Sequence, residues 1–406
     1  MGGMPSFEFP WQRMAAGANL LSPNGDLGVT IFEEITTLAV KHQAINLGQG
    51  FPDTDGPEVF KNIAAQGISG HLNQYAPGSG ILPLRVAIAD HQKRFYGLDV
   101  NPENEVVVTT GATEAIAAAV LAFVEPGDEV IAFEPYYDSY GATIGLAGGT
   151  LKTVALSAPD FQPDLAELRK AFNARTRMVV LNNPHNPTGA AFGPEVLSEI
   201  VALAKQHDCL IISDEVYEHL TFGFSHIPIA TLPGAWDRTI TISSAGKTFS
   251  FTGWKVGWAT GPADLIAAVR TVKQFLSYSS GTAFQPAVAE ALASEPAFFA
   301  DFAKELGDRS EVLAKGLESA GMTVYRPQGT YFIVADVAPL GFDNALELAR
   351  QMPEKIGVAG IPLSVFCHEE GAERTRTLMR FACSKKPELL IEASRRLSRL
   401  TTKLGG

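Results

Sequence analysis

The chain has 406 residues, of which 46% are hydrophobic and 19% are charged, and its net charge is −12. A chain of this length is expected to form two domains, and the composition is typical of a globular protein. The acidic balance argues against nucleic acid as a partner, because binding to a phosphate backbone needs clustered Lys and Arg. No run of about 18 apolar residues occurs, so the sequence predicts no membrane-spanning helix.

Short motifs point to no metal site and no disulfide framework. The three cysteines (Cys209, Cys367 and Cys383) lack C-x-x-C spacing, which predicts a reducing compartment, and a cytoplasmic enzyme is expected. The eight histidines form no H-E-x-x-H motif and no Cys/His cluster, so no metal is expected. Residues Met1–Ser6 formally fit a myristoylation pattern, but so short a pattern often matches by chance.

Strand-like and helix-like patterns alternate through the middle of the chain. Strands are predicted at Glu105–Thr110, Glu129–Phe133, Met178–Leu181, Leu210–Ser213, Thr239–Ile242 and Val256–Thr260. Helices are predicted at Ala112–Phe123, Pro194–His207 and Asp264–Leu276. The alternation is typical of an α/β fold in which helices cover both faces of a mainly parallel, doubly wound sheet.

The pattern changes after about residue 290. A long polar helix is predicted first, then three strands and a final amphipathic helix, at Glu295–Ser319, Thr323–Tyr325, Thr330–Val334, Thr377–Cys383 and Pro387–Leu404. This predicts a smaller α+β domain at residues 291–406 after a large domain at residues 51–290. Residues 1–50 are expected to pack with the small domain.

Four chemically distinctive segments follow predicted strands. They are Gly111–Thr113, Asn183–Gly189, Asp214–Tyr217 and Ser243–Lys247. Ligands of open α/β sheets gather at the carboxyl ends of the strands, so these segments are expected to form one shared site. The coincidence does not name the ligand.

Lys247 suits an imine-forming amine beside a bound phosphate. It follows a β-branched strand and small hydroxyl residues, and Lys255 comes eight positions later. The phosphate would lie at Gly111-Ala112-Thr113, where a strand-to-helix junction offers free N–H groups and a helix dipole, with Ser244 and Lys255 adding a hydroxyl and a positive charge. Ser244–Lys247 also satisfies the S-x-x-K motif of serine acyl-enzymes, but S-D-N and K-T-G are absent.

The segments Asn182–Gly189, Ser213–Tyr217 and Thr239–Trp258 together resemble the cofactor site of pyridoxal-phosphate (PLP) aminotransferases of fold type I, and the resemblance covers nearly the whole chain. It implies that Lys247 is the Schiff-base lysine and that Asp214 pairs with the pyridine nitrogen. Tyr217 and Asn186 would hydrogen-bond the 3-oxygen. Taken alone, Lys247 would be a surface lysine, Asp214 equally a helix N-cap, Tyr217 a half-buried aromatic and Asn186 a turn residue.

The resemblance also implies the residues that surround the cofactor and substrate. Tyr137 would stack on the pyridine ring, and Tyr75 would reach the phosphate of a neighbouring subunit, which makes a homodimer the expected active unit. Arg380 would bind the substrate α-carboxylate, assisted by the backbone of Gly50. The resemblance at Lys255 is to the kynurenine/glutamine/methionine-type branch of the family, which also has a lysine at this position. The aspartate-type branch has an arginine there.

Strings outside the cofactor motifs resemble bacterial N-succinyldiaminopimelate aminotransferases. These strings are Gly48–Asp53, Gly111–Ala115, Gln274–Tyr278, Phe284–Ala289 and Pro353–Val358. The resemblance implies transfer of an amino group between N-succinyl-LL-2,6-diaminopimelate and 2-oxoglutarate. A broad aromatic, kynurenine, glutamine or methionine aminotransferase and a cysteine-conjugate C–S β-lyase remain alternatives, since no second cation for a distal carboxylate is identified and nothing forbids elimination. A binding-only regulator is the third alternative, although the set of site residues looks complete.

Overall fold

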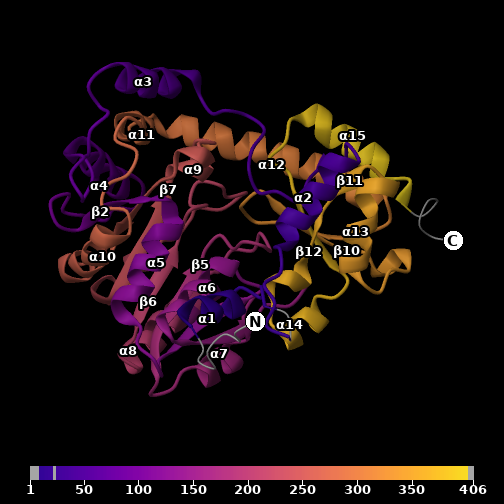
Figure 1. Ribbon diagram of the computed structural model, residues 1–406, viewed down its shortest axis with the longest axis horizontal. Helices are drawn as coiled ribbons and strands as arrows, with labels where there is room; N and C mark the ends of the chain where they lie inside the picture. The colour runs from indigo at the N-terminus through magenta and orange to yellow at the C-terminus, as the bar shows by residue number, and fades with distance from the viewer. Residues whose placement is uncertain (1–8, 22–23, 401–406) are drawn as a thin grey trace, which may run out of the picture.

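The computed structural model describes residues 9–21 and 24–400, so the Met1–Ser6 pattern lies outside the described residues. A seven-stranded sheet with the order β2-β8-β7-β6-β5-β3-β4 dominates the fold (Figure 1). Its strands are β2 (Val106–Thr110), β3 (Glu129–Glu134), β4 (Thr150–Ala155), β5 (Thr176–Asn182), β6 (Leu210–Asp214), β7 (Thr239–Ser244) and β8 (Val256–Thr260). All are parallel except β8, which runs antiparallel to both of its neighbours. The predicted α/β class is confirmed.

Helices bury both faces of this sheet. On β3, Val130 and Ala132 share a core with helices α5 (Gly111–Phe123), α6 (Asp138–Ala147) and α10 (Ala263–Leu276). Ile131 and Phe133 point to the opposite face and pack with helices α7 (Leu165–Ala171) and α8 (Pro194–Gln206). Burial on both faces explains why the strands read as continuous apolar runs and not as alternating ones.

A third apolar cluster lies at the β2 edge of the sheet, beside the segment that carries Lys247. There Phe249 and Phe251 pack with helices α3 (Glu58–Ser69), α4 (Leu82–Tyr96) and α11 (Gln285–Leu292). Figure 1 shows these three helices on the same side of the sheet as β2. Short 3-10 helices complete the connections, at Ile229–Thr231, Trp236–Arg238, Thr252–Trp254, Ala338–Leu340 and Leu363–Phe366. Within the described residues, no helix is both long and apolar enough to cross a membrane.

The second sheet is antiparallel and has the order β12-β13-β10-β9. Its strands are β9 (Thr323–Tyr325), β10 (Phe332–Asp336), β12 (Ile361–Pro362) and β13 (Leu378–Ala382), and its helices are α12 (Pro296–Ser319), α13 (Ala345–Lys355), α14 (Glu369–Arg374) and α15 (Pro387–Leu397). One apolar cluster runs from the α7/α8 face of the larger sheet through this smaller sheet. The two sheets therefore share buried surface.

The N-terminal segment contacts both parts. Strand β1 (Ile45–Asn46) pairs in parallel with β11 (Val358–Ala359), and helix α2 (Ile31–Lys41) packs on α13 through a Glu34–Arg350 ion pair of 2.7 Å. Helix α1 (Pro10–Gly17) instead lies against α6 of the larger sheet (Figure 1). The domain limits at residues 50 and 290 stay predictions.

The predicted strands and helices all occur, with ends that differ by a few residues. The final helix, predicted to Leu404, ends at Leu397 as α15, and residues 401–404 of the prediction lie outside the described residues. Several helices were not predicted, among them α6, in which two glycines lower the intrinsic helix propensity. Those glycines allow α1 to approach closely: a Cβ on Gly141 would lie 2.1 Å from the carbonyl oxygen of Gly17.

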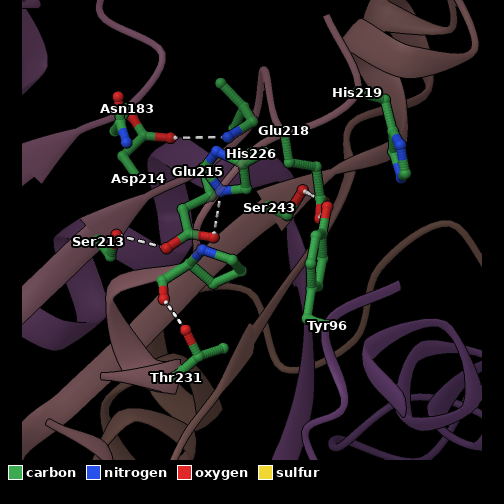
Figure 2. Close-up of polar contacts among 12 residues, drawn as sticks. Tyr96, Asn183, Ser213, Asp214, Glu215, Glu218, His219, His226, Thr231 and Ser243 are labelled. Atoms are coloured by element: carbon green, nitrogen blue, oxygen red, sulfur yellow. Dashed lines mark hydrogen bonds and ion pairs between the residues drawn. The ribbon is translucent and has the colours of Figure 1, made fainter. Parts of the chain in front are cut away.

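A buried polar network lies beside the ends of β6 and β7 (Figure 2). Glu218 accepts hydrogen bonds from Tyr96 (2.7 Å) and Ser243 (2.6 Å). Glu215 accepts one from Ser213 (2.7 Å) and lies 2.8 Å from His226 Nε2. Burial raises the pKa of Glu218 to about 7. The bond between Glu218 and Ser243 connects the segment after β6 to the end of β7. Asp214 is the last residue of β6, and Lys247 lies three residues after the end of β7.

Two histidines extend this network. His91 and His219, 128 positions apart, bring their Nε2 atoms to 2.6 Å, and with Glu218 they place possible metal-ligand atoms within 4.8 Å of one another. No short motif marks this cluster, because its two histidines lie 128 positions apart. Two nitrogens on one tetrahedral zinc ion would be roughly 3.3 Å apart, given Zn–N bonds of about 2.05 Å. The 2.6 Å between the two Nε2 atoms is shorter than this, and both carboxylate oxygens of Glu218 already accept hydrogen bonds from Tyr96 and Ser243. The three side chains therefore form a hydrogen-bonded cluster.

The buried histidines predict a loss of stability in acid. Burial lowers the pKa of His91 to about 3, below the ordinary value of 6.5, so between these values the unfolded chain binds more protons than the folded one. Stability therefore falls as the pH drops below about 6.5, by about 1.4 kcal/mol per pH unit for one such group. When the pH is lowered from 7.5 to 5.5, the unfolding free energy of the wild type should fall by about 1.4 kcal/mol more than that of His91→Gln. Urea titrations at the two pH values measure this difference.

The matched control is His71→Gln, because the His71 side chain is exposed. Its unfolding free energy should follow the wild-type pH dependence. Equal pH dependence in wild type and His91→Gln would show that His91 is not held neutral by burial.

Candidate active site

A cavity of about 190 Å³ opens where the four distinctive segments meet, at the carboxyl ends of the parallel strands. It brings together most of the residues singled out in the sequence. Its lining includes Gly111, Ala112, Thr113, Tyr137, Asn186, Asp214, Tyr217, Ser244, Lys247 and Lys255, together with Asn182, Gly246 and Thr252. The expectation of one shared site therefore agrees with the fold.

Asp214 forms one end of the cavity. It is the last residue of β6, and its Oδ2 accepts a hydrogen bond of 2.6 Å from the Tyr140 hydroxyl. Burial raises its pKa to about 6, while the bond from Tyr140, the Val216 N–H and the charge of Lys247 oppose that rise. The N-cap alternative is wrong, because a turn and no helix follows β6.

The opposite end of the cavity is suited to an anion. Helix α5 begins there at Gly111, whose φ is +73°, and a 13-residue helix directs its free N–H groups and positive dipole end at this point. A Cβ on Gly111 would lie 3.2 Å from Lys255 Nζ, so the ammonium group packs against the glycine backbone. Ser244 lines the same cavity as the N-cap residue of helix α9 (Ala245–Thr248).

Lys247 lies in α9 directly after β7, and β7 stands in the sheet between β6, which ends at Asp214, and β8 and β2, which lead to the anion end. Its Nζ is 5.7 Å from the ring centroids of both Tyr217 and Tyr331. Tyr217 is fully buried, not half-buried, and burial raises the pKa of its hydroxyl well above the ordinary value. Tyr137 lines the cavity from the N-cap of α6 and meets Tyr140 edge-on at 5.7 Å.

Arg380 comes from β13 of the smaller sheet and is only 2% exposed. It donates to Asn186 Oδ1 (3.0 Å) and to the carbonyl oxygen of Gly48 (2.9 Å), both neutral acceptors. Its Nε is buried without a hydrogen-bond partner. Its guanidinium carbon lies 4.0 Å from the centroid of the Phe332 ring, and burial lowers its pKa to about 10. Asn186 therefore links the cavity to this cation.

Gly50 and Tyr75 lie outside the cavity lining. The carbonyl oxygen of Gly50 accepts a hydrogen bond from Tyr331 (2.6 Å), and Arg380 contacts Gly48 instead. A Cβ on Gly50 would come within 2.5 Å of Phe332, so the position has no space for a side chain. Tyr75 is 83% exposed and meets Tyr278 edge-on at 5.4 Å.

The predicted site residues did not include Gly48, Tyr140, Asn182, Gly246, Thr252 and Tyr331, which all belong to this region. Asn182 ends β5, donates to the backbone oxygen of Asp214 (2.8 Å) and accepts from the Asn186 N–H (2.7 Å). Tyr140 lies three residues after Tyr137, which places both on one face of α6, and that spacing is the one signal the sequence held.

The donor set matches a ligand with three features. The cavity is lined by an ionisable carboxylate after β6, by an α-helix N-terminus with a nearby ammonium group after β2, and by a lysine amine after β7, the strand between them in the sheet. Such a site suits a flat ring with a basic nitrogen, a carbon that bonds to an amine, and a phosphate. PLP has all three.

Comparisons with known proteins agree with this geometry. The aminotransferase class I and II family matches residues 42–396. A Mycobacterium tuberculosis protein known as the probable N-succinyldiaminopimelate aminotransferase DapC is 49% identical to this chain, over 91% of this chain and 95% of the relative. The methionine aminotransferase of Escherichia coli is 39% identical, over 92% of this chain and 96% of the relative.

The solved structure of N-succinyldiaminopimelate aminotransferase from M. tuberculosis superposes with a TM-score of 0.89 at 50% identity, covering 92% of this chain and 97% of that one. The family match, these identities and the cavity agree on one conclusion. The chain belongs to the aminotransferase class I and II family and is a PLP-dependent aminotransferase of fold type I.

Proposed function

We propose that this enzyme transfers an amino group between N-succinyl-LL-2,6-diaminopimelate and 2-oxoglutarate. The observation that carries the proposal is the 49% identity, over 91% of the chain, with the M. tuberculosis protein named for that substrate. The identity with the methionine aminotransferase of E. coli is ten points lower over a similar span. The reaction belongs in lysine biosynthesis, and the expected compartment is the cytoplasm.

The residues that would hold PLP follow from the two ends of the cavity. Asp214 would face the pyridine nitrogen, and Gly111, Ala112, Thr113, Ser244 and Lys255 would surround the phosphate. Tyr137 would lie against the ring, while Tyr217 and Asn186 would hydrogen-bond its 3-oxygen. When bound, PLP supplies an electron sink for the negative charge left on the substrate Cα after its proton is removed.

Lys247 is proposed to bond to the cofactor and, when the substrate amine replaces it, to move the Cα proton. An amine in this role must be unprotonated to accept that proton and then returns it at a different carbon. The position of Lys247 in the cavity lining supports this role, because it lies between the carboxylate and the anion ends. Tyr217 and Tyr331 flank the amine.

Arg380 is proposed to bind the substrate α-carboxylate, with Asn186 and the backbone near Gly50 completing that subsite. A buried cation is costly unless an anion pairs with it. The two acceptors that Arg380 has are neutral, and its Nε has none, so hydrogen-bonding capacity remains for a carboxylate. Phe32, Phe332 and Phe366 surround the guanidinium group and keep the subsite apolar.

A homodimer is proposed from the surface around Tyr75. Large apolar side chains are exposed there: Ile68, Leu72, Tyr75, Phe275 and Leu276. The loop that carries Tyr75 is held against the end of α10, since a Cβ on Gly78 would meet Gln274 and Tyr278. Exposed apolar patches of this kind mark protein–protein interfaces. Tyr75 would then complete the phosphate subsite of the partner.

The second candidate is a broader aminotransferase for methionine or aromatic amino acids. The relation to the E. coli methionine aminotransferase favours it. So does the cavity itself, because its only positively charged lining residues within the described chain are Lys247 and Lys255, and neither is free for a distal carboxylate in the proposed arrangement.

A direct comparison of amino donors separates these candidates. With 2-oxoglutarate as acceptor, kcat/KM for N-succinyl-LL-2,6-diaminopimelate should exceed the values for methionine, glutamine and kynurenine by about tenfold or more, a margin of about 1.4 kcal/mol. Glutamate formation measures each rate. Higher kcat/KM for methionine or kynurenine would reject the proposed substrate, and pyruvate and ammonia released from cysteine conjugates would favour the β-lyase.

Arg380→Lys tests the carboxylate subsite. Lysine keeps the charge but loses the planar pair of donors, so kcat/KM should fall by about 10- to 100-fold, the loss expected for one hydrogen bond to a charged group. The loss should be equal for every amino donor, because all carry the same α-carboxylate. Arg376→Lys, an exposed arginine on the same segment, should retain wild-type kcat/KM. Unchanged kcat/KM in Arg380→Lys would place the subsite elsewhere.

Paired heterodimers test whether Tyr75 acts across subunits. Two tagged chains are co-expressed, one Lys247→Ala and one Tyr75→Ala, and the heterodimer is purified through both tags. One of its two sites then has both residues intact, so activity should be about half that of wild type. The control places both substitutions in one chain beside a wild-type partner and should leave no intact site. If Tyr75 serves its own subunit, the two results are reversed.

A further inference from the structure

We propose that Tyr140 is a positioning residue for the cofactor: its hydroxyl holds Asp214 in the ionised form that pairs with the pyridine nitrogen. The inference rests on the proposed placement of PLP against Asp214. Tyr140 does not line the cavity, so it would act only through the carboxylate.

The contact between the two side chains is close and fixed. The Tyr140 hydroxyl donates to Asp214 Oδ2 at 2.6 Å, and the two residues are 2% and 4% exposed. The Tyr140 ring meets Tyr137 edge-on at 5.7 Å with an interplanar angle of 90°. Both tyrosines belong to the start of α6, so the helix that presents a ring to the cavity also presents a hydroxyl to the carboxylate behind it.

Several groups face Asp214, from different elements. Tyr140 and Tyr137 approach from α6, Lys247 from α9, and Glu215, Tyr217 and the Val216 N–H from the turn after β6. Burial and the charge of Glu215 favour the protonated acid, while Tyr140, Val216 and Lys247 favour the carboxylate. Val216 makes a long contact of 3.4 Å, whereas Tyr140 makes a short one. Tyr140 is thus the main hydrogen-bond donor to this carboxylate.

Burial raises the pKa of Tyr140 well above its ordinary value, so its hydroxyl stays a donor throughout the working pH range. The proton balance of binding then gives a measurable signature. The bound pair, carboxylate and protonated pyridine, holds one proton. At a pH below the pKa of Asp214 in the free protein, the two partners before binding are the protonated Asp214 and the protonated pyridine, which together hold two protons. One proton must therefore be released on binding. Affinity for PLP therefore falls in acid, and it falls earlier when the Asp214 pKa is higher.

The chain contains a matched control for the loss of a buried tyrosine hydroxyl. Tyr96 donates to Glu218 at 2.7 Å, and both residues of this pair lie in the buried network of Figure 2. Both carboxylates have a pKa raised by burial, to about 6 for Asp214 and about 7 for Glu218. Glu218 does not line the cavity. Tyr96→Phe therefore removes the same kind of bond without touching the carboxylate that faces PLP.

The test measures the affinity of full-length protein for PLP by equilibrium dialysis from pH 5.5 to 8.5. Tyr140→Phe should match wild type at pH 8.5 and bind about tenfold more weakly at pH 5.5, because losing a hydrogen bond to a charged group raises the Asp214 pKa by about one unit. Tyr96→Phe should keep the wild-type pH dependence. The PLP phosphate also titrates near pH 6, but equally in every variant, so it cancels in the comparison.

Each outcome decides one question. A loss of affinity in Tyr140→Phe that is equal at all pH values would show a structural role only, and an unchanged profile would overturn the inference outright. The proposed placement of PLP fails separately: Asp214→Asn should abolish this acid-dependent loss, and a retained loss in that variant would show that Asp214 does not face the pyridine nitrogen.

Discussion

The negative charge at the end of β6 is the constraint around which the rest of the site is arranged. A carboxylate in the protein interior is costly, and burial alone pushes Asp214 towards its neutral form. The chain opposes this with Tyr140 from α6, the turn after β6 and Lys247 from α9. Asn182 from β5 binds the Asp214 backbone and so fixes its direction. Two strands and two helices must therefore be in place to hold this buried charge.

The anion end depends on close backbone packing. A Cβ on Gly257 of β8 would lie 2.7 Å from the Ala112 nitrogen, so only glycine lets β8 pass so near the start of α5. Because β8 is antiparallel to its neighbours, its N-terminal end carries Lys255 to the same edge as the carboxyl ends of β2 and β7. The one reversed strand of the sheet thus delivers a positive charge where the parallel strands deliver the helix terminus and the lysine.

The proposed carboxylate subsite draws on the second sheet. Arg380 is carried by β13, yet it bonds to Asn186 after β5 and to Gly48 after β1. The cation therefore joins the large sheet, the small sheet and the N-terminal segment at one point. A carboxylate bound there would contact groups from all three, which links substrate binding to the relative position of the two sheets.

The amino-acid sequence by itself determined the fold class, most strand positions and the meeting of four polar segments at one edge of the sheet, because these depend on local patterns. Strands buried on both faces read as apolar runs, and polar residues directly after them must meet at one sheet edge. Motif resemblance added Arg380 and Tyr75, which no local pattern would single out.

Tertiary structure alone decided which distant groups touch. Helix α6 forms in spite of its glycines, whose lack of a side chain lets α1 pack against it. Tyr140 of this helix then reaches Asp214, 74 positions later. His91 and His219 meet across 128 positions, and Arg380 bonds to Gly48 across 332. Such contacts follow from packing between elements, whose relative placement depends on the sum of many small apolar contacts and not on any single spacing in the chain.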